Sequence, residues 1–272
     1  MQVAVVGHVE WIDFVRVERL PVPGEIMHAA EAWQEPGGGG AVAAVVLAAL
    51  AGQCRFLTAL GDDLLGRRAA AELGALGLRV EAAIRPEAQR RAVTYVDASG
   101  ERTITLLSRK LVPEGRDALP WDELSEADAV YFTGGDAQAL RAARRARVLV
   151  ATARELPTLV EAGVELDALV RSGGDPGEAY EPGALDPPPR LVVATEGASG
   201  GVYVVGSGNH RYAAAAVPGG IRDTYGSGDS FAAGLTYGLA RGLAVDAALE
   251  LASRCGALAL TRRGAYGGSL AP

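Results

Sequence analysis

The sequence has few of the residues that build covalent or metal-bound frameworks. It contains two cysteines and three histidines in 272 residues, and Lys110 is its only lysine. Cys54 and Cys255 lie far apart, no CxxC pair occurs, and the histidines are scattered. A disulfide framework or a structural zinc site is therefore not expected, and we predict two buried free thiols.

Long hydrophobic runs and excess positive charge are also missing. The longest unbroken apolar run, residues 41–51, is far shorter than the roughly 20 residues that span a bilayer, so it predicts a buried helix. The first residues, MQVAVVGHVE, lack the basic region and cleavage site of a signal peptide, which favours a cytoplasmic location. A net charge of -7 gives no basic surface for nucleic acid.

What the sequence does contain is an alternation of short apolar runs with helical patterns. Residues 3–6 form an apolar run that ends at Gly7, as in a strand buried on both faces. The other expected strands are residues 54–60, 129–133, 148–151, 168–170 and 191–195, and the clearest helical patterns are 41–50 and 64–76. This order predicts a three-layer α/β fold with a doubly wound, mostly parallel sheet.

Two segments interrupt this alternation. Residues 11–34 hold two extended pieces around a Pro/Gly turn, and residues 91–108 hold two β-rich runs around a hairpin signal at 97–100. We expect both to form a small β-lid over one end of a single domain spanning residues 1–272. Because exposed strand edges tend to pair with another chain, we predict a homodimer formed through the lid.

The stretch DTYGSGDSFAAG, residues 223–234, carries the strongest chemical signal. Gly226, Ser227 and Gly228 lead into a helical pattern that has Asp229 in its first turn. Free amides and the positive end of the helix dipole suit the charge that develops on a phosphoryl group in transfer. Asp229 could then act as the general base that takes the proton of an alcohol. The alternative is that Asp229 or Ser230 only caps the helix.

The same stretch resembles the C-terminal signature of the ribokinase-like sugar kinases, the PfkB carbohydrate kinase family, in which the pattern is D-T-x-G-A-G-D. Ser227 stands where the family has alanine. Other segments resemble further family motifs in the same order, over nearly the whole chain. They are LPVPGE at 20–25, PGGGGAVAAVVLAALAG at 36–52, LGDDLLGR at 60–67, TEGASG at 195–200, and ALALTRRGA at 257–265, which matches the closing helix.

The resemblance implies an ATP-dependent phosphotransferase that uses Mg²⁺ and phosphorylates a hydroxymethyl group of a sugar or sugar-like molecule. It places the sugar at Gly38 and Gly39. It places ATP along Thr195, Gly197, Gly200 and Ser253. Neither a P-loop motif nor a complete Rossmann fingerprint occurs, so those nucleotide-binding folds are not supported.

Near the expected acceptor site the sequence departs from the family pattern. Val42 stands where relatives have an asparagine, and Ile12 stands where they have an aspartate, with Asp13 one position later. Because side chains alternate along a strand, Asp13 would face the other way unless the backbone bulges. Glu10 is then the better candidate for binding acceptor hydroxyls, with help from His8. A simple hydrogen-bonded His8–Glu10 pair is the alternative.

The metal motif is also altered. The family's N-x-x-E falls on residues 172–175, where Asp175 keeps a carboxylate for magnesium and Glu178 is the reserve candidate. The alternative, which the sequence Asp-Pro-Gly favours, is that Asp175 is an ordinary turn residue. The resemblance also suggests that Asp223 shapes a loop for a monovalent cation such as K⁺, against the alternative of a turn-initiating residue.

Two other functions remain open from the sequence. A nucleoside kinase of the same fold would use the same residues on a different acceptor. A non-catalytic sugar or nucleotide sensor would explain the changes at Ile12 and Val42, although the intact stretch 226–229 favours a kinase.

Overall fold

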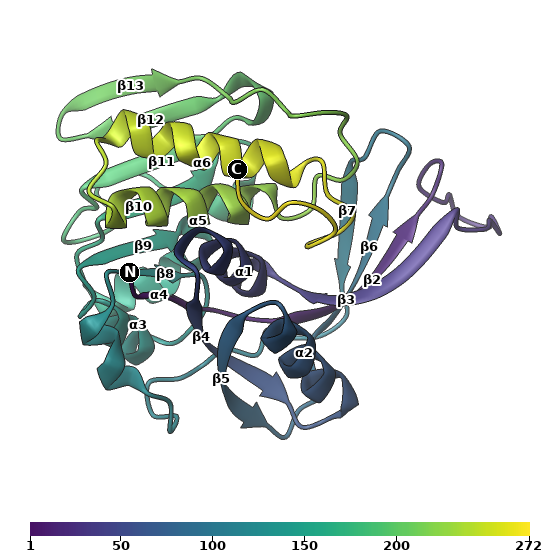
Figure 1. Cartoon of the computed structure of the whole chain (residues 1–272), viewed down its shortest axis with the longest axis horizontal. Coiled ribbons are helices and arrows are strands. Elements are labelled where there is room, and N and C mark those ends of the chain that lie inside the picture. Colours follow the sequence, from purple (N-terminus) through teal and green to yellow (C-terminus); the bar gives the residue numbers. More distant parts are fainter.

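The computed structural model describes all 272 residues and has a nine-stranded sheet at its centre (Figure 1). The strand order is β13-β12-β11-β10-β9-β8-β1-β4-β5. In this order, all strands from β11 to β5 run parallel to their neighbours. The predicted doubly wound, mostly parallel sheet is therefore confirmed. The strands are β1 (Val3–Val6), β4 (Cys54–Gly61), β5 (Leu78–Arg85), β8 (Ala129–Phe132), β9 (Val148–Thr152), β10 (Ala168–Ser172), β11 (Leu191–Thr195), β12 (Gly201–Val205) and β13 (Gly208–Tyr212).

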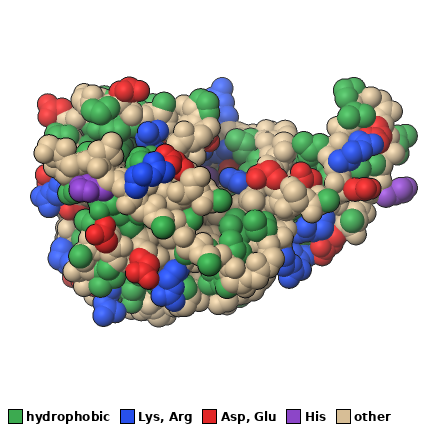
Figure 2. Space-filling model, turned by 90° about the horizontal axis from the view of Figure 1, so that it is seen from above, with side chains coloured by type: hydrophobic (Ala, Val, Ile, Leu, Met, Phe, Trp, Pro, Cys, Tyr) green, Lys and Arg blue, Asp and Glu red, His purple; other side chains and the backbone are tan.

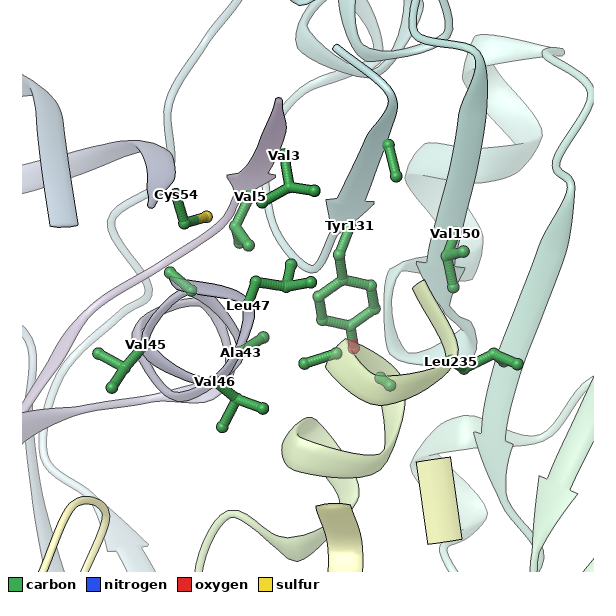
Figure 3. Close-up of a cluster of buried hydrophobic side chains, with 14 of the residues drawn as sticks. Val3, Val5, Ala43, Val45, Val46, Leu47, Cys54, Tyr131, Val150 and Leu235 are labelled. Atoms are coloured by element: carbon green, nitrogen blue, oxygen red, sulfur yellow. The ribbon is translucent and has the colours of Figure 1, made fainter. Parts of the chain in front are cut away.

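Helices cover both faces of this sheet. On one face lie α1 (Gly39–Ala51), α2 (Leu64–Ala75), α5 (Ser227–Ala240) and α6 (Val245–Ala259). On the other lie α3 (Ala137–Ala143), α4 (Leu156–Ala162) and the 3₁₀ turn η1 (Trp121–Glu126). Val3 and Val5 of β1 point to the α1 side, as Figure 3 shows, and Ala4 and Val6 point to the other, which is why this strand is apolar throughout.

Helix α1 is the buried helix that the apolar run predicted, since its residues from Gly40 to Ala48 are buried. The closing segment differs from the expectation. Helix α6 ends at Ala259, so only the first part of ALALTRRGA is helical. The chain then turns, and the buried Arg262 donates hydrogen bonds to the carbonyls of Ser269 and Leu270. None of the helices is sufficiently long and apolar for a membrane crossing.

The four strands of the second sheet have the order β3-β2-β6-β7. They are β2 (Glu10–Arg16), β3 (Glu31–Gly37), β6 (Arg91–Val96) and β7 (Arg102–Leu106), of which β6 and β7 form the expected hairpin. Ile12 and Phe14 pack against Val42 and Tyr225, and Trp33 stacks on Phe14 with ring centroids 4.9 Å apart. In Figure 2 this sheet extends from the main body, and the surface between them is hollowed.

Candidate active site

Asp229 lies in the first turn of α5, as the sequence predicted. Gly226, with φ of 73°, is the N-cap, and no side chain caps the helix. Asp229 therefore does not turn back on its own backbone, and no donor of the protein hydrogen-bonds its carboxylate. The capping alternative does not describe this residue. A carboxylate that is free to accept a proton stands beside the open amides of the helix N-terminus.

The surroundings of Asp229 raise its affinity for a proton. Burial raises the pKa of its carboxyl to about 6, and the positive charges of His8, Arg102 and Arg154 offset part of this effect. The side chain nevertheless keeps some contact with solvent. A base with a pKa near 6 is mostly ionised at neutral pH and still strong enough to take a proton from a reacting alcohol.

The glycine run at the start of α1 lies between Asp229 and Glu10. A Cβ atom on Gly39 would lie 2.7 Å from Oδ1 of Asp229, and one on Gly38 would lie 3.2 Å from Cγ of Glu10 and from Cδ2 of His8. The missing side chains let the carboxylates of Asp229 and Glu10 approach the same helix end. Gly38 is held there because its amide donates to the hydroxyl of Tyr225 at 2.7 Å. The structure therefore brings together Gly38, Gly39, Glu10 and Asp229.

Glu10 is buried beside Arg90 and His8. Its carboxylate lies 3.1 Å from Nε of Arg90 and 3.5 Å from Nε2 of His8. Burial alone would raise the pKa of Glu10, but the His8 hydrogen bond and the charges of Arg90 and Lys110 outweigh it, so the pKa is lowered. The alternative of a His8–Glu10 pair thus describes part of this arrangement, and the pair lies at the glycine run that was expected to hold the acceptor.

Asp13 lies on the opposite face of β2. The pairing of β2 with β3 runs without a bulge from Glu10 to Arg16, so alternation turns Asp13 away from Glu10. Its carboxylate accepts hydrogen bonds from Gln34 and, at 2.8 Å, from Arg91. The structure does not bring Asp13 to the acceptor side. Ile12, at the family's aspartate position, is buried in the second sheet's core.

The residues expected to bind ATP meet around the segment that follows β13. A Cβ atom on Gly200 would lie 2.1 Å from the carbonyl oxygen of Tyr212, and the Ser253 hydroxyl lies 3.5 Å from the carbonyl oxygen of Ala213. Thr195 ends β11, and Gly197 begins the 3₁₀ turn η4 (Gly197–Ser199) that leads to Gly200. Ser253 is buried rather than solvent-exposed.

One turn beyond Ser253, α6 reaches the loop that precedes Asp229. A Cβ atom on Gly256 would lie 3.3 Å from the carbonyl oxygen of Ser227. The nucleotide candidate Ser253 and the glycine-rich loop are therefore neighbours in space, although α5 and its following loop lie between them in the sequence. A ligand lying along Gly200 and Ser253 would end near Ser227 and Asp229.

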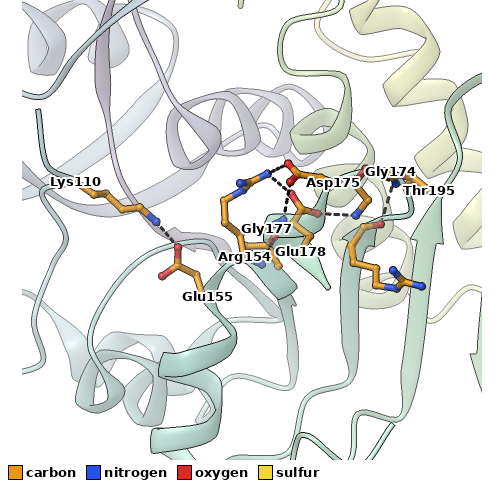
Figure 4. A network of polar contacts seen from close by, with 11 residues as sticks. Lys110, Arg154, Glu155, Gly174, Asp175, Gly177, Glu178 and Thr195 are labelled. Carbon is orange, nitrogen blue, oxygen red and sulfur yellow. Dashed lines mark hydrogen bonds and ion pairs between the residues drawn. The ribbon is translucent and has the colours of Figure 1, made fainter. Parts of the chain in front are cut away.

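Asp175 and Glu178 both contact Arg154 (Figure 4). Nη2 of Arg154 lies 2.6 Å from each carboxylate. Asp175 also accepts from the Gly177 amide, and Glu178 from the Ser172 amide. The hydrogen bond from Arg154 lowers the pKa of Asp175. Two carboxylates that share one guanidinium are not free magnesium ligands, and no group of three or more His, Cys, Asp or Glu side chains forms a metal site. These residues do not fit direct binding of the ion.

Asp223 is fully buried and organises the turn before Gly226. Its carboxylate accepts hydrogen bonds from the amides of Tyr225 at 2.8 Å and Gly264 at 3.0 Å. Burial raises its pKa, and these two amides lower it in part. The hydrogen bond from Tyr225 is the one expected of a turn-initiating residue. The hydrogen bond from Gly264 links the C-terminal segment to the glycine-rich loop.

Sequence reasoning missed three arginines near these carboxylates: Arg90, Arg102 and Arg154. Arg102, in β7, donates from Nη1 to the hydroxyl of Thr224 at 3.2 Å, which links the second sheet to the glycine-rich loop. Arginine is so frequent in this chain that composition gives none of them special weight. The position of Arg154 just after an expected strand was the one available signal.

A cavity of about 490 Å³ opens beside α3. Its polar lining includes Glu114, Arg116 and Asp136, and none of the candidate residues above contributes to it. Asp136 accepts hydrogen bonds from the amides of Gly115 and Ala139 and so serves as a cap. We therefore place the chemistry at Asp229 and not in this cavity.

Known proteins resemble the chain over almost its full length. Residues 1–161 and 183–271 match the model of the pfkB family carbohydrate kinases. An ATP-dependent ribose-1-phosphate kinase from Halopiger xanaduensis is 28% identical, with 95% of this chain and 92% of that protein covered.

Solved structures share the fold. A ribokinase from Thermotoga maritima has a TM-score of 0.77 at 22% identity, covering 97% of this chain and 94% of that one. An adenosine kinase from Sinorhizobium meliloti has a TM-score of 0.79 at 19% identity, covering 97% and 95%. At these identities the likeness concerns the arrangement of the elements.

Proposed function

The chain belongs to the pfkB family of carbohydrate kinases, as its motifs indicated, and we propose that Asp229 is the general base of its reaction. Membership makes the protein an ATP-dependent kinase of a sugar or nucleoside. The observation that carries the assignment of Asp229 is its free carboxylate, which stands at the open N-terminus of α5 and faces Gly39.

The proposed reaction uses residues that the fold already places together. The acceptor's hydroxymethyl oxygen attacks the γ-phosphorus of ATP, its proton passes to Asp229, and the bond from this phosphorus to the departing ADP oxygen breaks. The amides of Gly226, Ser227, Gly228 and Asp229 stabilise the charge that develops on the phosphoryl oxygens. The charges of Arg102 and Arg154 lower the pKa of Asp229 in part, and the charge of Glu178 opposes them.

The acceptor lies over Gly38 and Gly39 with its hydroxymethyl group toward Asp229 and its other end toward Glu10 and His8. A nucleoside is the second candidate, and an adenosine kinase has the same fold. A third candidate is ribose 1-phosphate, the compound named for the Halopiger relative.

We further propose that ATP lies along Thr195, Gly197, Gly200 and Ser253 and brings Mg²⁺ on its phosphates. Because Arg154 holds Asp175 and Glu178, we assign neither as a direct magnesium ligand. A K⁺ ion at the Asp223 loop stays a prediction. The working form is a cytoplasmic homodimer that pairs through the second sheet, with this sheet acting as a lid over the acceptor.

Replacing Asp229 with asparagine tests the assignment. Asp229→Asn keeps the size of the side chain but removes the base, so we expect kcat to fall by about 100-fold or more, with ATP affinity nearly unchanged. Turnover is measured on pentoses, ketohexoses, sugar acids, nucleosides and sugar phosphates, and ATP binding by calorimetry. Asp122→Asn, on an exposed carboxylate, is the matched control.

Unchanged turnover in Asp229→Asn would refute the role of this residue. If the wild-type protein binds acceptor and ATP but phosphorylates none of the panel, the sensor alternative holds. Hydrolysis of ATP alone does not decide between them, because water can replace the acceptor.

A further inference from the structure

We propose that Thr133 binds the acceptor and that its hydroxyl, together with the carboxylate of Asp229, holds the hydroxymethyl group in place for transfer. This inference deepens the proposed kinase function and rests on it. Thr133 directly follows β8, at the carboxyl edge of the central sheet. Ligands of open α/β sheets bind at this edge.

The backbone of Thr133 is held by the segment that contains β1. Its amide donates to the carbonyl of Val6 at 2.9 Å, and its carbonyl oxygen lies 3.3 Å from Nδ1 of His8. Only 4% of the residue is exposed. The protein therefore fixes the position of Thr133 beside His8 before any ligand binds.

Two glycines show which way the side chain of Thr133 points. A Cβ atom on Gly7 would lie 2.7 Å from the methyl carbon Cγ2 of Thr133, so the methyl group fills space that this glycine leaves free. A Cβ atom on Gly39 would lie 3.2 Å from the hydroxyl oxygen Oγ1. Because a β-branched side chain is stiff at χ1, packing of the methyl group at Gly7 directs the hydroxyl toward the first turn of α1.

The hydroxyl of Thr133 and the carboxylate of Asp229 face the same space. The Cβ position on Gly39 that lies near Oγ1 of Thr133 also lies 2.7 Å from Oδ1 of Asp229. In the proposed reaction the acceptor lies over Gly39 with its hydroxymethyl group toward Asp229. The reacting end of the acceptor is then within reach of Thr133 as well.

Thr133 has hydrogen-bonding capacity left for a ligand. Its hydroxyl shares a hydrogen bond with the buried hydroxyl of Tyr131. Since a hydroxyl has one hydrogen and two lone pairs, this bond leaves room for an acceptor oxygen. Ile12 and Val42 lie in the apolar core of the second sheet and offer the acceptor no such bond.

Steady-state kinetics of two variants tests the proposal, with the panel compound that wild type phosphorylates fastest as acceptor. Thr133→Val keeps the shape of the side chain and its methyl contact but removes the hydroxyl. Because the acceptor oxygen then loses its partner in a buried site, kcat/KM for the acceptor should fall about 5- to 30-fold. Thr133→Ser keeps the hydroxyl and should stay within about threefold of wild type.

Thr58→Val is the matched control. Thr58 lies in β4 of the same sheet, and its hydroxyl is buried without a hydrogen-bond partner, so this variant should have wild-type kinetics. ATP affinity measured by calorimetry should be the same in Thr133→Val and wild type, which separates loss of an acceptor contact from a distorted site. Thr133→Ala is compared with Thr133→Ser if the valine variant does not fold.

Equal kcat/KM for the acceptor in Thr133→Val and wild type overturns the proposal. So does a serine variant as poor as the valine variant, because the hydroxyl is then not the group that matters. Failure of the kinase assignment has a different signature, namely no phosphorylated product from any acceptor. Calorimetry with the panel compounds then decides the role of Thr133. Weaker binding by Thr133→Val supports it, whereas equal binding, or no binding of any compound by wild type, contradicts it.

Discussion

At the scale of the residue, Asp229 shows how a catalytic role opposes stability. Burial raises its pKa from the ordinary 3.8 to about 6. The folded state therefore binds this proton more tightly than the unfolded chain, and stability falls as pH rises through the window from about 4 to 6. At pH 7 the ionised carboxylate costs up to about 3 kcal/mol, because each pKa unit corresponds to about 1.4 kcal/mol.

Asp229→Asn should therefore stabilise the protein while it inactivates it. We expect a gain of about 1–3 kcal/mol in the free energy of unfolding at pH 7, shrinking toward zero near pH 4. Urea unfolding at several pH values measures this difference, with Asp122→Asn as the surface control. A variant less stable than wild type at pH 7 contradicts the view that the charged form of Asp229 is disfavoured.

At the scale of the element, the first turn of α1 has no room for a side chain at Gly39. A methyl group there would lie 2.7 Å from Oδ1 of Asp229 and must displace it. Gly39→Ala should lower kcat on the order of 100-fold, because small displacements of a catalytic group are costly, and should leave the fold intact.

Gly74→Ala is the matched control, since a Cβ atom there meets nothing within 4 Å in α2. It should raise the free energy of unfolding by about 0.5–1 kcal/mol and leave kcat unchanged. Steady-state kinetics and thermal unfolding of both variants test the pair. If Gly39→Ala turns over like Gly74→Ala, the tight approach of Asp229 to α1 has no catalytic meaning.

The helices and strands differ in how well the sequence predicted them. Apolar runs and helical periods predicted the central strands and the helix behind Asp229, because both patterns depend on neighbouring residues. The outer strand β5 and the β12–β13 hairpin were not predicted. β5 and β13 are only partly buried, and charged or polar residues interrupt their apolar ones. The apolar sequence of β12, GVYVV, was an available signal. The pairing of Arg154 with Asp175 and Glu178 brings together two segments, one after β9 and one after β10, and leaves no local signal.

At the scale of the whole molecule, the second sheet has an unpaired edge. β7 is one of its two outer strands, and Ile104 and Leu106 are 39% and 52% exposed on one face of it. Such an edge favours pairing with a second copy of the chain. We expect light scattering at micromolar concentration to give a dimer.

Leu106→Glu should weaken this dimer at least tenfold, because burying a leucine contributes about 2 kcal/mol and a buried charge opposes association. Thr105→Glu puts the same charge on the other face of β7 and should leave the dimer intact. A monomeric wild-type protein contradicts the proposed dimer, and disruption by Thr105→Glu alone contradicts the assigned face.

Because Trp33 stacks on Phe14 in the second sheet, its fluorescence can report on this sheet. Trp11 lies on β2 of the same sheet, but its side chain packs in the core on the α1 side, and the Trp121 side chain packs in the core on the α3 side. Each of the three regions thus holds one indole fluorophore. With Trp11 and Trp121 replaced by phenylalanine, the remaining emission would report the second sheet alone, in real time, as acceptor and nucleotide are mixed in.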